Sequence, residues 1–196
     1  MEQAKVYFTK SITAESLQKI YHALGVTLKG KVAVKISSGD TNGYSLARKV
    51  LFDVAGYKVD TMVDGMDKSI GEALATPHRS YYPSLIDLCN KKIIQGLAHI
   101  TGSGYQGNIP RILPDNVDVI IDRTTWDPPM IFKLIQQAGS VEKDEMYSTF
   151  NMGMGMLIFI DPKDKAEVTA HLEAKGEKWT QIGEVVAGTK QVKFRD

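Results

Sequence analysis

The apolar residues of this chain follow two alternating periods, one typical of helices and one typical of strands. Between residues 44 and 54, for example, Leu46, Val50, Leu51 and Val54 fall on one helical face, whereas Val32, Val34 and Ile36 alternate with other residues as in a strand. The helical period predicts helices at residues 13–24, 44–54, 70–75, 84–89, 129–137, 142–150 and 162–175. Strands are predicted at residues 5–9, 31–36, 95–100, 117–121, 152–160, 180–187 and 191–194.

This mixture of elements predicts an α/β (α+β) fold in which a mixed β-sheet is covered by helices. The chain has 196 residues and 43% hydrophobic content, enough for one domain with a small appendage. Residues 1–36 read as strand, helix and strand, a small βαβ-sized unit. We therefore expect an N-terminal segment at 1–36 and a larger domain at 37–196.

Charge and cysteine content exclude several classes of protein. Lys and Arg total 24 against 23 Asp and Glu, a net charge of +1, so we expect neither nucleic acid nor a membrane as partner. The single cysteine, Cys89, excludes an internal disulfide and a multi-cysteine metal site. No apolar run approaches membrane-spanning length and the N-terminus lacks a signal-peptide pattern, so a cytoplasmic location is expected.

The glycine-rich run at residues 101–111, Thr-Gly-Ser-Gly-Tyr-Gln-Gly-Asn-Ile-Pro-Arg, is the first candidate site. Glycines after a strand let consecutive backbone N–H groups converge on an anion, and Arg111 adds a guanidinium fork. An ordinary turn beside a solvated arginine explains the pattern equally well. The run matches neither of the common glycine-rich nucleotide-binding motifs.

A second loop, Ser-Ser-Gly-Asp-Thr-Asn-Gly at residues 37–43, joins a predicted strand to a predicted helix. The free N–H groups of a helix start favour anions. Alone, this loop is more simply a capped helix start, but two such loops in one domain favour a binding site. Gly153 and Gly155 allow close approach of either another strand or a ligand.

Six ordered blocks resemble the C-terminal half of aminoimidazole ribonucleotide synthetase, also called phosphoribosylformylglycinamidine cyclo-ligase. They cover about residues 37–194. The blocks are Asn-Gly-Tyr-Ser-Leu-Ala-Arg-Lys-Val at 42–50, Gly-Glu-Ala-Leu at 71–74, Gly-Leu-Ala-His-Ile-Thr-Gly at 96–102, Asn-Ile-Pro-Arg at 108–111, Phe-Asn-Met-Gly at 150–153 and Ile-Gly-Glu-Val-Val at 182–186.

The resemblance implies a role in purine biosynthesis, in ATP-dependent closure of an imidazole ring on a phosphoribosyl substrate. The full-length family uses ATP and Mg²⁺, has two α/β domains per subunit, forms homodimers and holds ATP mainly in its N-terminal domain. The implied substrate- or phosphate-binding residues are glycine-rich-loop residues on two walls of a cleft. They are Ser38, Gly39, Asn42 and Gly43 on one wall, and Thr101, Gly102, Gly104, Asn108 and Arg111 on the other.

The sequence also departs from the family. The small loop has Asp40 and Thr41 where the family commonly has a histidine, and residues 1–36 do not resemble the ATP-binding N-terminal domain. We therefore expect a cyclo-ligase domain that is not active alone, with no catalytic residue or metal ligand assigned. Two alternatives stay open: activity restored by a separate N-terminal-domain partner or a homodimer, and a non-catalytic binding or scaffold module.

Overall fold

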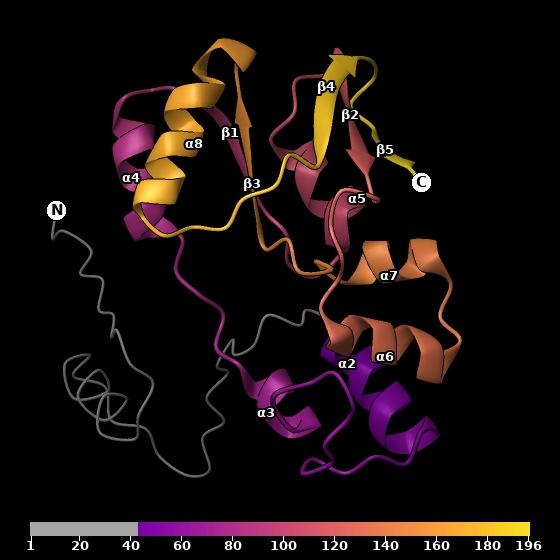
Figure 1. Cartoon of the computed structure of the whole chain (residues 1–196). Coiled ribbons are helices and arrows are strands. Elements are labelled where there is room, and N and C mark those ends of the chain that lie inside the picture. The colour runs from indigo at the N-terminus through magenta and orange to yellow at the C-terminus, as the bar shows by residue number, and fades with distance from the viewer. Residues whose placement is uncertain (1–42) are drawn as a thin grey trace, which may run out of the picture. The chain divides into compact units, whose positions relative to one another are not determined.

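The computed structural model describes residues 43–196 (Figure 1). The chain divides into two units, Met1–Ile36 and Ser37–Asp196, and the described residues all belong to the second. The elements predicted at residues 5–9, 13–24 and 31–36 lie outside the described residues. Ser38, Gly39, Asp40 and Asn42 of the small loop also lie outside them.

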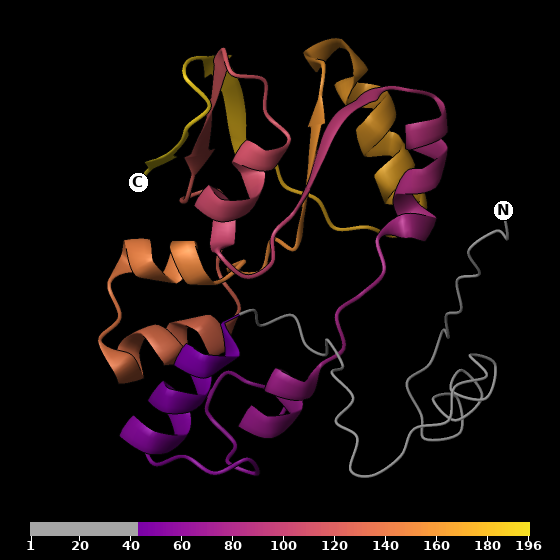
Figure 2. The same cartoon turned by 180° about the vertical axis from the view of Figure 1, so that it is seen from behind.

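One part of the domain is a two-stranded sheet with two helices packed on it. Strands β1 (Ile94–His99) and β3 (Met156–Ile160) pair antiparallel. Helices α4 (Tyr82–Asn90) and α8 (Lys165–Ala174) lie side by side against one face of this sheet (Figures 1 and 2). Burial of apolar side chains from both helices holds this layer together. The buried residues are Leu85, Leu88, Val168 and Leu172.

A second sheet has three strands in the order β4-β2-β5. The central strand β2 (Val117–Asp122) pairs antiparallel with β4 (Gly183–Ala187) and parallel with β5 (Val192–Arg195). The predicted mixed topology is therefore confirmed, although the five described strands form two separate sheets.

Helices make up the rest of the described residues. Helix α2 (Tyr44–Arg48) continues into the π-helix η1 (Lys49–Val54), which packs on α6 (Met130–Gly139). Helix α7 (Lys143–Thr149) lies between α6 and the short helix α5 (Gly104–Asn108). The larger hydrophobic core joins these helices to the second sheet. Its fully buried side chains include Leu51, Ile70, Tyr105, Ile109, Ile121, Phe132, Ile135, Met146 and Phe150.

A short α-helix and a 3₁₀ turn are further elements of the described chain. Helix α3 (Ile70–Ala75) begins at a capping box, in which Ser69 and Glu72 each accept a hydrogen bond from the backbone N–H of the other. The 3₁₀ turn η3 (Pro162–Asp164) precedes α8. Between α3 and α4 the chain forms no helix or strand and carries His78 and Arg79.

Most predicted elements lie where the pattern places them, although the strand predicted at 180–187 begins only at Gly183. Two further segments differ from the prediction. Residues 101–111 were predicted as a turn, but they form α5 followed by the 3₁₀ turn η2 (Ile109–Arg111). The predicted strand at 152–160 begins only at Met156, because residues 151–155 form a tight loop with positive φ angles at Met152 and Gly153.

A candidate ligand pocket beside the loop 151–155

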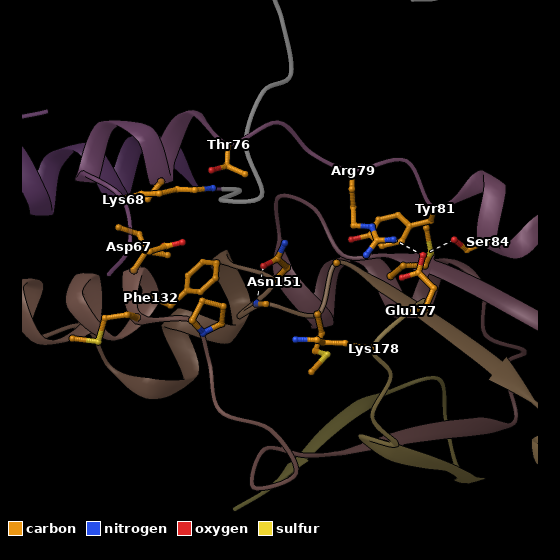
Figure 3. A pocket seen from close by; sticks show the side chains of 18 of the residues that line it. Asp67, Lys68, Thr76, Arg79, Tyr81, Ser84, Phe132, Asn151, Glu177 and Lys178 are labelled. Carbon is orange, nitrogen blue, oxygen red and sulfur yellow. Dashed lines mark hydrogen bonds and ion pairs between the residues drawn. The ribbon is translucent and has the colours of Figure 1, made fainter. Parts of the chain in front are cut away.

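A pocket of about 440 Å³ opens beside the loop 151–155. Its walls come from five separate segments of the domain, so it depends on the tertiary fold (Figure 3). These segments are the loop 65–68, residues 73–85, the start of α6, the loop and strand at 151–158, and the end of α8 with the two residues Glu177 and Lys178.

Backbone hydrogen bonds give the loop 151–155 a defined shape. The Oδ1 atom of buried Asn151 accepts a 2.9 Å hydrogen bond from the N–H of Gly153. The N–H of Met154 donates to the carbonyl of Asn151 at 2.9 Å, and the indole N–H of Trp126 donates to the carbonyl of Met152 at 3.0 Å. These hydrogen bonds hold the loop that forms one wall of the pocket.

Close packing explains both glycines of this loop. Gly153 has φ +95° and lies against the ring of Pro129, at 2.6 Å from the position that a β-carbon would take. A β-carbon at Gly155 would overlap the hydroxyl of Tyr81. At both positions the close neighbour is a side chain, that of Pro129 or Tyr81, and not the strand or the ligand that the sequence left open; both glycines also line the pocket.

Charged side chains gather at two ends of the pocket (Figure 3). Asp67 and Lys68 lie at one end, and Arg79 and Glu177 form an ion pair at the other. The hydrogen bond from the Ser84 hydroxyl, and then the Arg79 guanidinium, lower the pKa of the Glu177 carboxyl. Glu177 is therefore ionised at neutral pH.

The lining suits a small, polar, anionic molecule that also has an uncharged body. Three cations line it, Lys68, Arg79 and Lys178, against the two carboxylates of Asp67 and Glu177. Apolar side chains supply much of the remaining surface, as in many small-molecule sites. Those side chains are Met66, Ala73, Leu85, Pro129, Met130, Ile131, Phe132, Met154, Met156, Ile158 and Leu172.

A second hollow, of about 360 Å³, is lined by residues of α4 and β1, among them Tyr82, Cys89, Leu97 and His99. The Nε2 atoms of His78 and His99 face each other beside it, with ring centroids 4.5 Å apart. No group of three or more His, Cys, Asp or Glu side chains within residues 43–196 is arranged to hold a metal ion.

Gly43 and Gly104, which the sequence assigned to two walls, pack against the same end of α7. A β-carbon at Gly43 would lie 2.8 Å from the Phe150 ring, and one at Gly104 would overlap the carbonyl oxygen of Tyr147. Gly43 and Gly104 thus contact consecutive residues, 147–150, at the C-terminal end of α7. Both residues serve close packing there.

Thr101, Gly102 and Gly104 of the predicted site contact the side chain of Asn108. Its Nδ2 atom donates to the carbonyl of Gly104 at 2.7 Å and to the carbonyl of Gly102 at 3.1 Å, with a weaker contact to the carbonyl of Thr101 at 3.4 Å. Asn108 is buried, so this amide fixes the glycine-rich run internally. Arg111 is exposed on η2 and has no ion pair among the described residues.

None of Gly43, Thr101, Gly102, Gly104, Asn108 and Arg111 lines the pocket. Their assignment as binding residues stays a prediction. Sequence reasoning did not select the polar pocket residues Lys68, Arg79, Glu177 and Lys178, which come from segments that are distant along the chain. The only available signal was the mixture of basic and aromatic residues at 78–82.

The sequence of residues 29–194 matches the family described as AIR synthase related protein, C-terminal domain. The chain belongs to this family. Curated relatives named phosphoribosylformylglycinamidine cyclo-ligase include those of Geotalea daltonii (44% identical over 180 residues, 90% of this chain and 52% of the relative) and Alkaliphilus metalliredigens (42% over 166 residues, 84% and 48%). The chain thus spans about half the length of the curated relatives that it matches.

Solved structures support the same fold at low sequence identity. The domain superposes on thiamine-monophosphate kinase from Stenotrophomonas maltophilia with a TM-score of 0.55 at 14% identity, covering 80% of this chain and 48% of that one. It superposes on the protein tt0281 from Thermus thermophilus with a TM-score of 0.50 at 19% identity, covering 82% and 50%. The predicted fold class is confirmed. None of the helices in residues 43–196 has the length and apolarity that a membrane span requires.

Proposed function

We propose that this chain is the C-terminal domain of a phosphoribosylformylglycinamidine cyclo-ligase of purine biosynthesis, and that its pocket binds the phosphoribosyl substrate during ATP-dependent imidazole ring closure. The observation that carries the proposal is the identity of 42–44% to relatives of that name over 84–90% of this chain. A cavity with three cations at its rim supports it, since a phosphoribosyl compound is anionic.

The domain does not perform the reaction alone in this proposal. Phosphoryl transfer depends on positioned ATP and metal ions, and Mg²⁺ is typically held by one or two carboxylates together with substrate phosphates. The pocket offers one carboxylate outside the Glu177 ion pair, that of Asp67, and no group of three or more His, Cys, Asp or Glu side chains in residues 43–196 is arranged to hold a metal ion. ATP and Mg²⁺ are therefore assigned to a separate ATP-binding half, supplied by a partner polypeptide or within a dimer.

Turnover measurements test this division of roles. The 196-residue chain is assayed for ATP-dependent cyclisation of phosphoribosylformylglycinamidine, alone and mixed with the N-terminal half of the Geotalea daltonii relative. We expect no turnover by the chain alone and measurable turnover by the mixture. Robust turnover by the chain alone would refute the proposed dependence on a second half, and an inactive mixture of folded halves would count against the ligase role.

A non-catalytic binding or scaffold module is the second candidate. The hydrogen bonds of Asn108 favour it. The side-chain amide donates to two carbonyls of the glycine-rich run, so contacts within the domain are enough to explain this run. Calorimetry with phosphate, ATP and ribose 5-phosphate separates the two. A scaffold gives no site-specific heat, and neither Arg111→Ala nor a pocket substitution changes the titration.

A further inference from the structure

Arg79 and Glu177 form their ion pair inside the pocket, where both side chains line its wall (Figure 3). The Oε1 atom of Glu177 accepts hydrogen bonds from Nη2 of Arg79 and from the hydroxyl of Ser84. The Glu177 side chain is only 13% exposed, whereas that of Arg79 is 51% exposed. The Glu177 carboxylate is thus paired with a guanidinium that lines the pocket.

The guanidinium of Arg79 keeps most of its binding capacity in this arrangement. Arginine has five N–H donors in a planar fork, and the described contacts engage only the Nη2 group of Arg79. Its carbon atom Cζ lies 5.1 Å from the centre of the Tyr81 ring, a cation–π contact that orients the plane. An oriented guanidinium with unused donors is suited to a bidentate oxyanion such as a phosphate.

The end of α8 places Glu177 at this position. Gly176 has φ +73°, its N–H donates to the carbonyl of Glu173 at 2.9 Å, and the N–H of Glu177 donates to the carbonyl of Leu172 at 2.9 Å. This pattern is a Schellman motif, which fixes the residue after the glycine. Lys178 follows directly and also lines the pocket, without an ion pair among the described residues.

The Arg79–Glu177 pair is not needed to hold α8 against α4. The ring Nε2 of His171 and the carbonyl of Ser84 are 3.0 Å apart, and two ion pairs outside the pocket join the same helices. These pairs are Lys175–Asp87 at 3.1 Å and Lys91–Glu167 at 2.6 Å. Because partly exposed ion pairs contribute little to stability, the pocket pair can open without disturbing the helices.

We propose that Arg79 binds the anionic group of the pocket's ligand and that Glu177 is an internal competitor, which the ligand displaces from the guanidinium. The assignment of a phosphoribosyl ligand rests on the proposed function. A phosphate monoester offers two oxygens to the fork, as a carboxylate does, but carries more negative charge, so it displaces Glu177 where a singly charged carboxylate does not. Glu177 would thereby make the pocket selective for phosphate esters over carboxylates.

Titration calorimetry of the full chain with ribose 5-phosphate tests the exchange. Arg79→Ala should weaken binding at least about tenfold, through loss of charge-assisted hydrogen bonds. Glu177→Gln keeps the shape of the side chain and removes its charge, and should tighten binding about 3- to 10-fold. When Arg79 is already alanine, Glu177→Gln should change affinity less than about twofold, because the competition it relieves is gone.

Lys91→Ala is the matched control, since it breaks an ion pair between the same two helices but outside the pocket. We expect its titration to equal that of the unsubstituted chain. Circular dichroism of each variant establishes that the domain is folded.

Two results overturn the inference and leave the proposed function standing. One is unchanged ribose 5-phosphate affinity in Arg79→Ala. The other is equal tightening by Glu177→Gln in both backgrounds, which would show a general effect of charge instead of competition for Arg79. If neither the unsubstituted chain nor Glu177→Gln binds ribose 5-phosphate, the inference and the proposed substrate pocket both fail.

Discussion

The hydroxyl of Tyr105 donates a 2.9 Å hydrogen bond to the backbone carbonyl of Asn151. Tyr105 belongs to the glycine-rich run and is fully buried, and burial raises the pKa of its hydroxyl, which stays protonated and able to donate. Asn151 begins the loop that forms one wall of the pocket. The glycine-rich run therefore supports the pocket from behind without lining it.

Removing this hydrogen bond should weaken the domain modestly. Tyr105→Phe keeps the ring among Trp126 and Tyr147 but deletes the donor, while the Asn151 carbonyl keeps its bond from Met154. We expect a loss of about 0.5–1.5 kcal/mol in the free energy of unfolding, measured by urea denaturation. Tyr82→Phe, at a side chain that is 68% exposed, should leave the midpoint unchanged. Equal effects of the two substitutions would contradict a support role for Tyr105.

Substitution by alanine should destabilise the domain at one glycine of this run and leave its stability unchanged at another. Gly104 has φ +53° and no room for a β-carbon beside Tyr147, so Gly104→Ala should cost about 2–5 kcal/mol through backbone strain and overpacking. Gly102 has open space around it, and Gly102→Ala should be neutral within about 0.5 kcal/mol. Thermal unfolding of both variants measures the difference. A stable Gly104→Ala domain would show that α5 does not pack on α7 as described.

Asp118 should make stability depend on pH in the acid range. Its carboxylate accepts hydrogen bonds from the Nζ atom of Lys193 at 2.7 Å and from two backbone N–H groups, those of Gln191 at 2.9 Å and Thr189 at 2.7 Å. These contacts lower its pKa from 3.8 to about 2. Because the pKa of Asp118 is lower in the folded state, its ionised carboxylate stabilises the fold at any pH above the unfolded-state pKa. That contribution is lost as the pH falls from about 4 towards 2.

Asp118→Asn removes this titration. The unsubstituted chain should be more stable than the variant at pH 7, and the difference in free energy of unfolding should shrink as the pH falls below about 4. Chemical denaturation at a series of pH values measures it. Asp60→Asn, at an exposed carboxylate with no ion pair among the described residues, should leave the profile unchanged. A difference that is constant from about pH 7 to about pH 2 would contradict the role given to Asp118.

Arg123 joins the last strand to α7. Its guanidinium bonds both oxygens of Asp196, at 2.7 and 2.6 Å, and Asp144 at 2.5 Å, and lies over the ring of Phe194. Lysine cannot reproduce this fork, so Arg123→Lys should cost about 1–2 kcal/mol. The control Arg195→Lys, at an exposed arginine with one bond to Glu184, should cost less than about 0.5 kcal/mol in the same denaturation experiment. Similar losses of stability in both variants would be inconsistent with the role of Arg123 in joining the last strand to α7.

The periodic apolar pattern was sufficient to predict most of the described helices and strands, because most of them bury one face. It failed at residues 101–111, where Asn108 and Tyr105 stabilise a helix through contacts that glycine content does not reveal. The pocket also could not be predicted from the sequence. Arg79 and Glu177 are 98 residues apart along the chain and meet only because α8 packs on α4.

Binding of the phosphoribosyl substrate in this pocket can be measured by a titration with phosphoribosylformylglycinamidine. Lys178→Glu reverses an exposed charge on the pocket wall, whereas Lys49→Glu reverses an exposed charge on η1, which does not line it. We predict that the unsubstituted chain and Lys49→Glu bind with equal affinity and that Lys178→Glu binds at least about fivefold more weakly. Absence of binding by the unsubstituted chain, or equal affinities for the two variants, would contradict substrate binding in this pocket.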